Sequence, residues 1–200
     1  MEISYSIVQK ESEYRILLAP ANLGSLSANA LKVLADRAID VSELMIDRIS
    51  GESTTEQDVL HDITGWVADL FANNPNLIIY YSCDDMTPIP SRNINSGNKD
   101  LPVNEYRSRL FTHIFDSYMS SHQVSGVTNT PIRLDNYENG MGYSLFFHLI
   151  ARDKHNDIVE MLKREIREVS GKDPDVTETP HEGGTLIGRT AGQLAVRLLL

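Results

Sequence analysis

The sequence feature that most constrains this chain is a short apolar run in its middle, LIIYYSC at residues 77–83. Asn-Pro-Asn precedes the run and Asp-Asp follows it, so turn-forming residues limit it to the length of one strand. A strand without a polar face must be covered on both sides. We therefore predict that Leu77–Cys83 is the central strand of a sheet with other elements on both of its faces.

A long polar segment and a helix follow this strand. Residues 84–102 hold three prolines and one glycine, which excludes regular structure, and connections of this length are usually functional or mobile. From Asn104, the expected N-cap, apolar residues recur at helical spacing, and Glu105 complements the free N–H groups of the first turn. The segment therefore predicts a loop that leads into a helix over 104–122.

Arg107 is the exception on this helix, because it falls in the middle of the apolar face. A guanidinium is costly to bury without a carboxylate or another anion beside it. Asp84 and Asp85 follow the central strand, so they can meet Arg107 if the helix packs back on that strand. Such a pairing is either a structural ion pair that holds the loop or part of a ligand site.

The remaining periodicities complete an α+β fold. They predict a hairpin of strands at residues 2–8 and 14–19, helices at 27–50 and 54–73, a second hairpin of strands at 131–137 and 143–151, and a last helix that ends at Gly171. The helix at 54–73 begins with the spacing of a capping box at 54–57, and Asp153 is the expected cap of the last helix. With the central strand, the order is ββααβαββα plus a C-terminal tail helix. We expect a mixed or antiparallel sheet of about five strands. Residues 1–170 form one domain in this interpretation, and residues 171–200 form a linker and tail.

The formal net charge of −10 argues against a protein that binds nucleic acid or an anionic membrane, because both need a basic surface. A single cysteine, Cys83, excludes an internal disulfide, and no apolar signal segment follows Met1. We therefore expect a cytoplasmic protein. The sequence shows no glycine-rich phosphate or dinucleotide loop, and we expect no cofactor.

The last stretch, residues 183–200, differs from the acidic body. It has no acidic residue, it carries Arg189 and Arg197, and it ends in three leucines. It is too short and too charged for a good membrane span. Three interpretations remain open: a tail docked on its own domain, a segment that binds a partner or a second copy, or foreign or frame-shifted sequence.

The candidates for chemistry gather around the long loop. Guanidinium groups match phosphate and carboxylate oxygens, which makes arginines near this loop candidates for an anion site, although we expect Arg109 in solvent beside Asp116. His148 lies on a predicted buried strand, where it is either a hydrogen-bonded core histidine or a base. The candidate ligand-binding residues are Asp84, Asp85, Arg92, Arg107 and His148.

Two other chemistries have the residue types but not the spacing. A catalytic thiol at Cys83 would need His113 or His148 beside it, whereas a cysteine at the end of a buried strand is usually a small core residue. A metal site lacks every familiar ligand motif. Its only available ligands would be Asp84, Asp85, Glu105, His148 and His155. We therefore predict neither a catalytic residue nor a metal.

Taken together, the segments CDDMTPIPSRN, EYRSRLF and FFHLIAR resemble a family of uncharacterised bacterial proteins of unknown function, over residues 76–168. The resemblance implies a bacterial or phage source and assigns no functional residue.

Two hypotheses for function follow. The first is a non-catalytic cytosolic binding or accessory protein that contacts a protein partner or forms a homo-oligomer. The alternative is an enzyme or small-ligand binder for a phosphorylated or carboxylated molecule, with its site in the 84–107 loop region.

Overall fold

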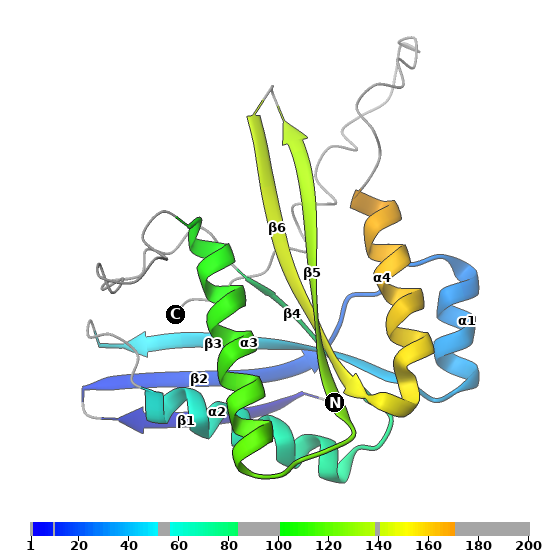
Figure 1. Cartoon of the computed structure of the whole chain (residues 1–200). Coiled ribbons are helices and arrows are strands. Elements are labelled where there is room, and N and C mark those ends of the chain that lie inside the picture. The colour runs from blue at the N-terminus through cyan, green and yellow to red at the C-terminus, as the bar shows by residue number, and fades with distance from the viewer. Residues whose placement is uncertain (1, 10, 52–56, 84–100, 139–140, 171–200) are drawn as a thin grey trace.

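A computed structural model describes residues 2–9, 11–51, 57–83, 101–138 and 141–170 of the chain (Figure 1). The described part is an α+β fold with one six-stranded sheet. Its elements are β1 (Ile3–Gln9), β2 (Ser12–Pro20), α1 (Ala28–Asp36), β3 (Asp40–Ser50), α2 (Gln57–Asn73), β4 (Leu77–Cys83), α3 (Val103–Ser121), β5 (Val127–Glu138), β6 (Met141–Arg152), a 3-10 turn (Asp153–His155) and α4 (Asn156–Ser170). The predicted fold class is confirmed, and the predicted tail lies outside the described residues.

The sheet is mixed, with strand order β1-β2-β3-β4-β6-β5. Only β3 and β4 pair in parallel, and every other neighbouring pair is antiparallel. The two predicted hairpins therefore lie at opposite ends of the sheet, and β4 joins them. This topology puts the apolar run that we predicted as the central strand at an interior position.

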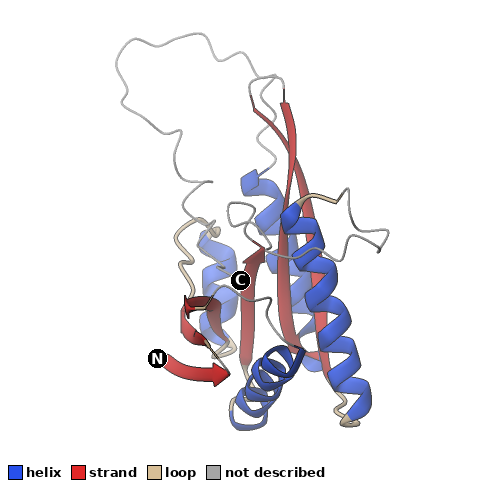
Figure 2. Cartoon of the chain, turned by 90° about the vertical axis from the view of Figure 1, so that its left-hand side faces the viewer, coloured by secondary structure: helices blue, strands red, loops and turns tan. Residues whose placement is uncertain are grey.

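Helices cover both faces of the central part of the sheet (Figures 1 and 2). Ile79 and Tyr81 of β4 belong to the apolar cluster formed with α2 and α3, whereas Ile78 and Tyr80 belong to the cluster formed with α1 and α4. All seven residues of β4 are buried, which confirms its predicted cover on both sides. Among the described helices, none is long and apolar enough to cross a membrane.

The predicted helix over 27–50 is wrong in its second half. Helix α1 ends at Asp36, Ala38 adopts a positive φ of 51°, and a strand begins at Asp40. The apolar residues of 40–50 fit a period of two as well as a helical one. Pairing settles the choice, because β2 on one side and β4 on the other satisfy the backbone groups of this segment. The observed order is ββαβαβαββα.

Two predicted helix caps are also corrected. Helix α3 begins at Val103 after Pro102, and Asn104 is not its N-cap. Instead, the Asn104 side-chain amide donates to the carbonyl of Ser144 over 2.7 Å, so it ties the start of α3 to β6. Asp153 starts the 3-10 turn, and α4 begins three residues later at Asn156. The capping box expected at 54–57 lies outside the described residues.

Gly51, directly after β3, lies so close to Ser12 of β2 that no side chain fits there. Its φ is +93°, and an added Cβ would lie 2.2 Å from the Oγ of Ser12 and 2.8 Å from its Cα. Gly126 also has a positive φ, +76°, but an added Cβ there would meet nothing within 4 Å. Gly51→Ala should therefore cost clearly more than the roughly 1 kcal/mol of backbone strain expected for Gly126→Ala. Urea unfolding of both variants measures the difference, and equal losses would contradict the steric argument.

Candidate functional site

Ser108, His148 and Asn129 form a hydrogen-bonded network that is largely buried between α3, β6 and β5. The Oγ of Ser108 on α3 lies 2.8 Å from Nε2 of His148 on β6. The other ring nitrogen, Nδ1, lies 2.9 Å from Oδ1 of Asn129 on β5. An amide oxygen can only accept, so Nδ1 carries the proton and Nε2 accepts from the serine hydroxyl. Both ring nitrogens of a neutral histidine are therefore satisfied.

His148 is 0% exposed, and its ring stacks on Tyr81 with 4.5 Å between centroids. Burial lowers the pKa of His148 to about 3, because an imidazolium would lose its hydration here without gaining a counter-charge. The geometry is that of a hydrogen-bonded core histidine, which was the simpler of our two interpretations. A ligand on the surface of the described domain cannot reach this ring without displacing Tyr81 or Phe111, which also contacts it.

The order serine, histidine and asparagine has the connectivity of a nucleophile, its base and the group that orients the base. Two observations argue against that role. Ser108 is buried, so a substrate would have little access to its hydroxyl. A histidine with a pKa of about 3 is also a poor acceptor for the proton of a serine at neutral pH. The network instead joins a helix to two strands.

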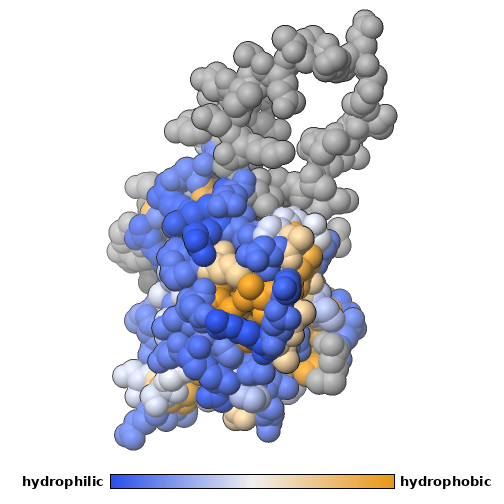
Figure 3. Space-filling view, turned by 90° about the vertical axis from the view of Figure 1, so that its right-hand side faces the viewer, coloured by the Kyte–Doolittle hydropathy of each residue, from blue (hydrophilic) through white to orange (hydrophobic). Residues whose placement is uncertain are grey.

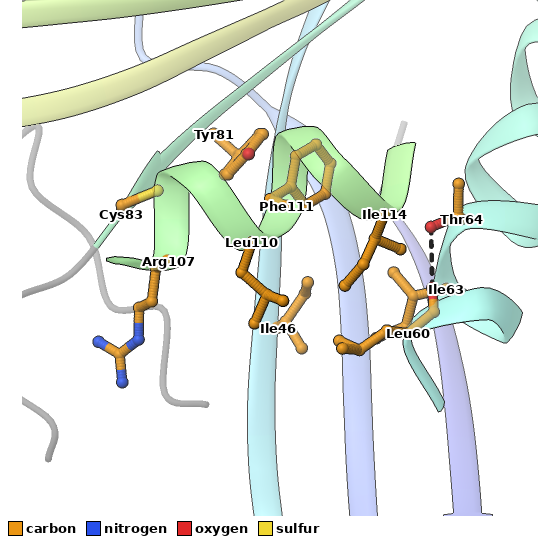
Figure 4. Close-up of a pocket in the computed structure, with 10 residues that line it drawn as sticks. All are labelled: Ile46, Leu60, Ile63, Thr64, Tyr81, Cys83, Arg107, Leu110, Phe111 and Ile114. Atoms are coloured by element: carbon orange, nitrogen blue, oxygen red, sulfur yellow. Dashed lines mark hydrogen bonds between the residues drawn. The ribbon is translucent and has the colours of Figure 1, made fainter. Parts of the chain in front are cut away.

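A small apolar cavity adjoins this network (Figure 4). The volume open to the centre of a water-sized molecule is about 30 Å³, enough for one or two waters and too little for a substrate. Figure 4 shows Leu110 and Ile114 of α3 turned toward Ile46, Leu60 and other apolar side chains. The lining residues are Ile46, Leu60, Ile63, Thr64, Tyr81, Cys83, Arg107, Leu110, Phe111 and Ile114.

Arg107, near the start of α3, and Cys83, at the end of β4, both line this cavity. Arg107 is buried, as its place on the apolar face of the helix predicts, and its guanidinium points away from Leu110 and Phe111 (Figure 4). Burial raises the pKa of the Cys83 thiol to about 12, and the nearby charge of Arg107 lowers it only in part. At neutral pH the thiol is therefore protonated, which fits a core cysteine better than a nucleophile.

Three of the remaining predicted site residues lie outside the described part of the chain, and the others have separate partners. Asp84, Asp85 and Arg92 lie outside the described residues, so the expected pairing with Arg107 does too. Arg109 is exposed as expected, but its ion-pair partner is Glu105 at 2.7 Å and not Asp116. The Nε2 of His155 lies 3.0 Å from the carbonyl oxygen of Pro75 and takes no part in the network of His148. The described ranges contain no cluster of His, Cys, Asp and Glu that could hold a metal.

A second candidate region, which we did not predict from the sequence, is the outer face of the three-stranded wing formed by β1, β2 and β3. Ile16 and Ile46 of this wing point into the cluster with α2. Their chain neighbours Leu17 and Met45, which oppose each other in the pairing of β2 with β3, point the other way. They are half-buried and belong to neither apolar cluster of the described structure. In Figure 1, α1 and α4 stand together beyond the right-hand ends of these strands.

The same face carries the two most exposed large apolar side chains among the described residues. Val8 on β1 is 73% exposed and Ile49 on β3 is 49% exposed. Ile49 lies where the pairing of β2 with β3 shifts register, and we group it with the outer face because it is exposed and belongs to neither apolar cluster. We call Val8, Leu17, Met45 and Ile49 the wing face. A strand interpretation of residues 40–50 would have placed Met45 on an outer sheet face, but we predicted a helix for that segment.

The end of the molecule where α1 and α4 lie together also exposes apolar surface (Figure 3). Leu31 of α1 is 40% exposed. Its half-buried neighbours, which include Leu23, Leu26 and Met161, pack against the cluster beneath α1 and α4. This surface is therefore mainly the outer edge of a core, whereas Leu17 and Met45 of the wing face have no core beneath them.

No protein-family model, curated protein or solved structure matches the chain. The resemblance to a bacterial family stays a prediction, and the argument for function depends on the geometry alone.

The buried histidine predicts a defined acid response. His148 is neutral in the folded protein down to pH of about 3, whereas the unfolded chain takes up the proton near 6.5. Between these values the unfolded state binds more protons than the folded state. The contribution of His148 to the free energy of unfolding is therefore fully present above pH 6.5, and it decreases as the pH drops, by up to about 1.4 kcal/mol per pH unit. His148→Gln should flatten this slope in urea titrations at graded pH. His113→Gln, on the exposed side of α3, should not, and equal slopes in all three proteins would contradict the assignment.

Proposed function

We propose that this chain is a non-catalytic, cytosolic binding protein that acts through protein–protein contacts made by the wing face. The observation that carries the proposal is the exposure of Val8 and Ile49 on a sheet face that no described helix covers. Fully burying one large apolar side chain contributes about 1.5–3 kcal/mol, so covering the exposed Val8 and Ile49 can contribute to the binding energy of an interface.

The charges of the wing face favour a protein partner over an anionic surface. Arg15 and Asp47 lie on the same side of the sheet and pair with each other over 3.0 Å. Glu43 of β3 lies farther along this side, and burial raises its pKa because its carboxylate is partly removed from water. The Arg15–Asp47 pair lies between Val8 and Ile49 on one side and the Leu17–Met45 pair on the other, so the wing face mixes apolar side chains with charges, as non-obligate protein interfaces commonly do. A partner would carry apolar side chains and a basic residue opposite Glu43.

The buried network supports a role without catalysis. Its serine and histidine are closed to solvent and are satisfied by each other and by Asn129. The Cys83 thiol is held in its protonated form. The polar groups in the described core that could do chemistry are therefore used to hold α3 against the sheet.

Two lysine substitutions separate the wing face from the other apolar surface. Ile49→Lys places a charge on the wing face, and Leu31→Lys places the same charge at a similarly exposed position on α1. We expect Ile49→Lys to reduce capture of a specific partner from the source cells by at least about tenfold, since a buried unpaired charge costs more than 1.4 kcal/mol. Leu31→Lys should retain it. Quantitative mass spectrometry of proteins recovered with each variant measures the ratio, and equal recovery would contradict the proposal.

Arg107 favours a second candidate function, the binding of a small phosphorylated or carboxylated molecule. A buried guanidinium at the end of a helix that follows a long loop is a positioned cation. The apolar cavity is too small to hold such a ligand, so the anion would have to approach Arg107 from the side of the guanidinium that faces away from Leu110.

Thermal unfolding in a panel of phosphorylated and carboxylated compounds tests this candidate. A ligand at about 100 times its Kd should stabilise the wild-type chain by about 2.7 kcal/mol and should leave Arg107→Met unchanged. Arg109→Met, which removes an exposed guanidinium two residues away, is the matched control and should respond like the wild type. If Arg107→Met fails to fold, the guanidinium is architectural and the candidate loses its support.

A further inference from the structure

The two edges of the sheet are protected very differently. Strand β5 forms one edge, and it carries Pro131, which has no N–H to donate, together with the exposed ion pair of Arg133 and Asp135. Such residues are the usual means by which an edge strand avoids pairing with another chain. The other edge, β1, has the sequence ISYSIVQ. It contains no charge and no proline.

An unprotected edge strand presents a row of backbone groups that are ready to pair. In an antiparallel sheet half of the N–H and C=O groups of an edge strand point away from its single neighbour. Strand β1 has its neighbour β2 on one side only, and four of its residues, Ser4, Tyr5, Ser6 and Val8, are exposed. Helix α2 contacts β1 from its face, through the stacking of Trp66 on Tyr5, and no strand among the described residues pairs with the outer edge of β1.

We propose that β1 is a dimer interface at which two copies of this chain pair antiparallel and join their sheets. The proposal goes beyond the wing-face function, because the edge can pair whether or not the wing face holds a partner. A second copy is the occupant that the sequence of β1 fits, since the strand is self-complementary about its central residue. Pairing centred on Ser6 uses all seven residues from Ile3 to Gln9.

The side chains match in this register. Tyr5 of one copy lies opposite Ile7 of the other, and both belong to the face that α2 covers, where Ile7 is buried and Tyr5 is 39% exposed. Aromatic and β-branched residues form a favourable cross-strand pair. Ser4 lies opposite Val8 on the outer face, so the pairing also covers part of the most exposed apolar side chain in the described structure. No like charges face each other across the new edge.

The net charge of the chain sets how the dimer should respond to salt. Each copy carries a formal charge of −10, so the two copies repel at long range. This repulsion is screened beyond about 10 Å at 0.1 M salt. Because the paired strands themselves are uncharged, added salt removes the repulsion and leaves the backbone pairing intact. The dimer should therefore tighten as ionic strength rises from 0.01 M to 0.15 M.

Sedimentation velocity of the full chain tests the proposal. We expect the molar mass of the wild type in solution to be twice the 22.4 kDa of one chain. Ser6→Lys places two lysines opposite each other at the centre of the pairing and should weaken association by at least about tenfold. Ser117→Lys makes the same substitution at an exposed position of α3 and should remain dimeric. Circular dichroism of both variants checks that they fold.

Cysteine cross-linking tests the register. Ser6→Cys would bring two thiols face to face, whereas the two thiols of Ser4→Cys would be roughly 14 Å apart along the strands, too far for a disulfide. The natural Cys83 is buried and does not compete. Under mild oxidation with diamide, Ser6→Cys should give a covalent dimer and Ser4→Cys should not.

Three outcomes would overturn the dimer proposal. They are a wild type that stays monomeric at about 100 µM, a dimer that Ser6→Lys does not weaken, and Ser4→Cys cross-linking as fast as Ser6→Cys. Each of these outcomes leaves the wing-face function untouched, since that function is judged from Ile49→Lys two strands away.

Discussion

The burial of β4 on both faces is the constraint on which the rest of the structure depends. All seven of its residues are withdrawn from water, which one layer of helices cannot achieve. The chain therefore supplies α2 and α3 on one face and α1 and α4 on the other. Because α3 lies against β4 and β6, the polar residues on its inner side, such as Ser108, are buried and need partners there. The network of Ser108, His148 and Asn129 meets that requirement.

This need explains why the most reactive side chains of the core are inert. An imidazole and a hydroxyl that satisfy each other in a dry setting stabilise one arrangement of helix and strands. The same burial that strengthens the hydrogen bonds of the network lowers the pKa of His148 and raises the pKa of the Cys83 thiol. A catalytic site needs the opposite conditions, namely access for a substrate and groups that titrate near neutral pH. We therefore propose the surface of the wing, and not the buried network, as the place where a partner binds.

Sequence patterns predicted the parts of the fold whose signals are local. The apolar run of β4, both hairpins and the helices at 57–73, 103–121 and 156–170 follow from periodicity and turn residues alone. The strand at 40–50 did not, because its apolar residues fit two periods and only the neighbours β2 and β4 decide between them. The site was harder still. His148 finds Ser108 and Asn129 through packing of distant segments, and no spacing in the sequence brings these three together.

The position of β4 also bears on the order in which the sheet can form. The strands on its two sides are neighbours in the chain within each hairpin, so β1 with β2 and β5 with β6 close short loops. Strand β4 instead pairs with β3 across the whole of α2 and with β6 across the whole of α3, as the partners of Ile78 at Val41 and Ala151 illustrate. Such long loop closures slow folding. We therefore expect the fully buried strand β4 to pair last. Until it pairs with β3 and β6, the two hairpins belong to separate half-sheets.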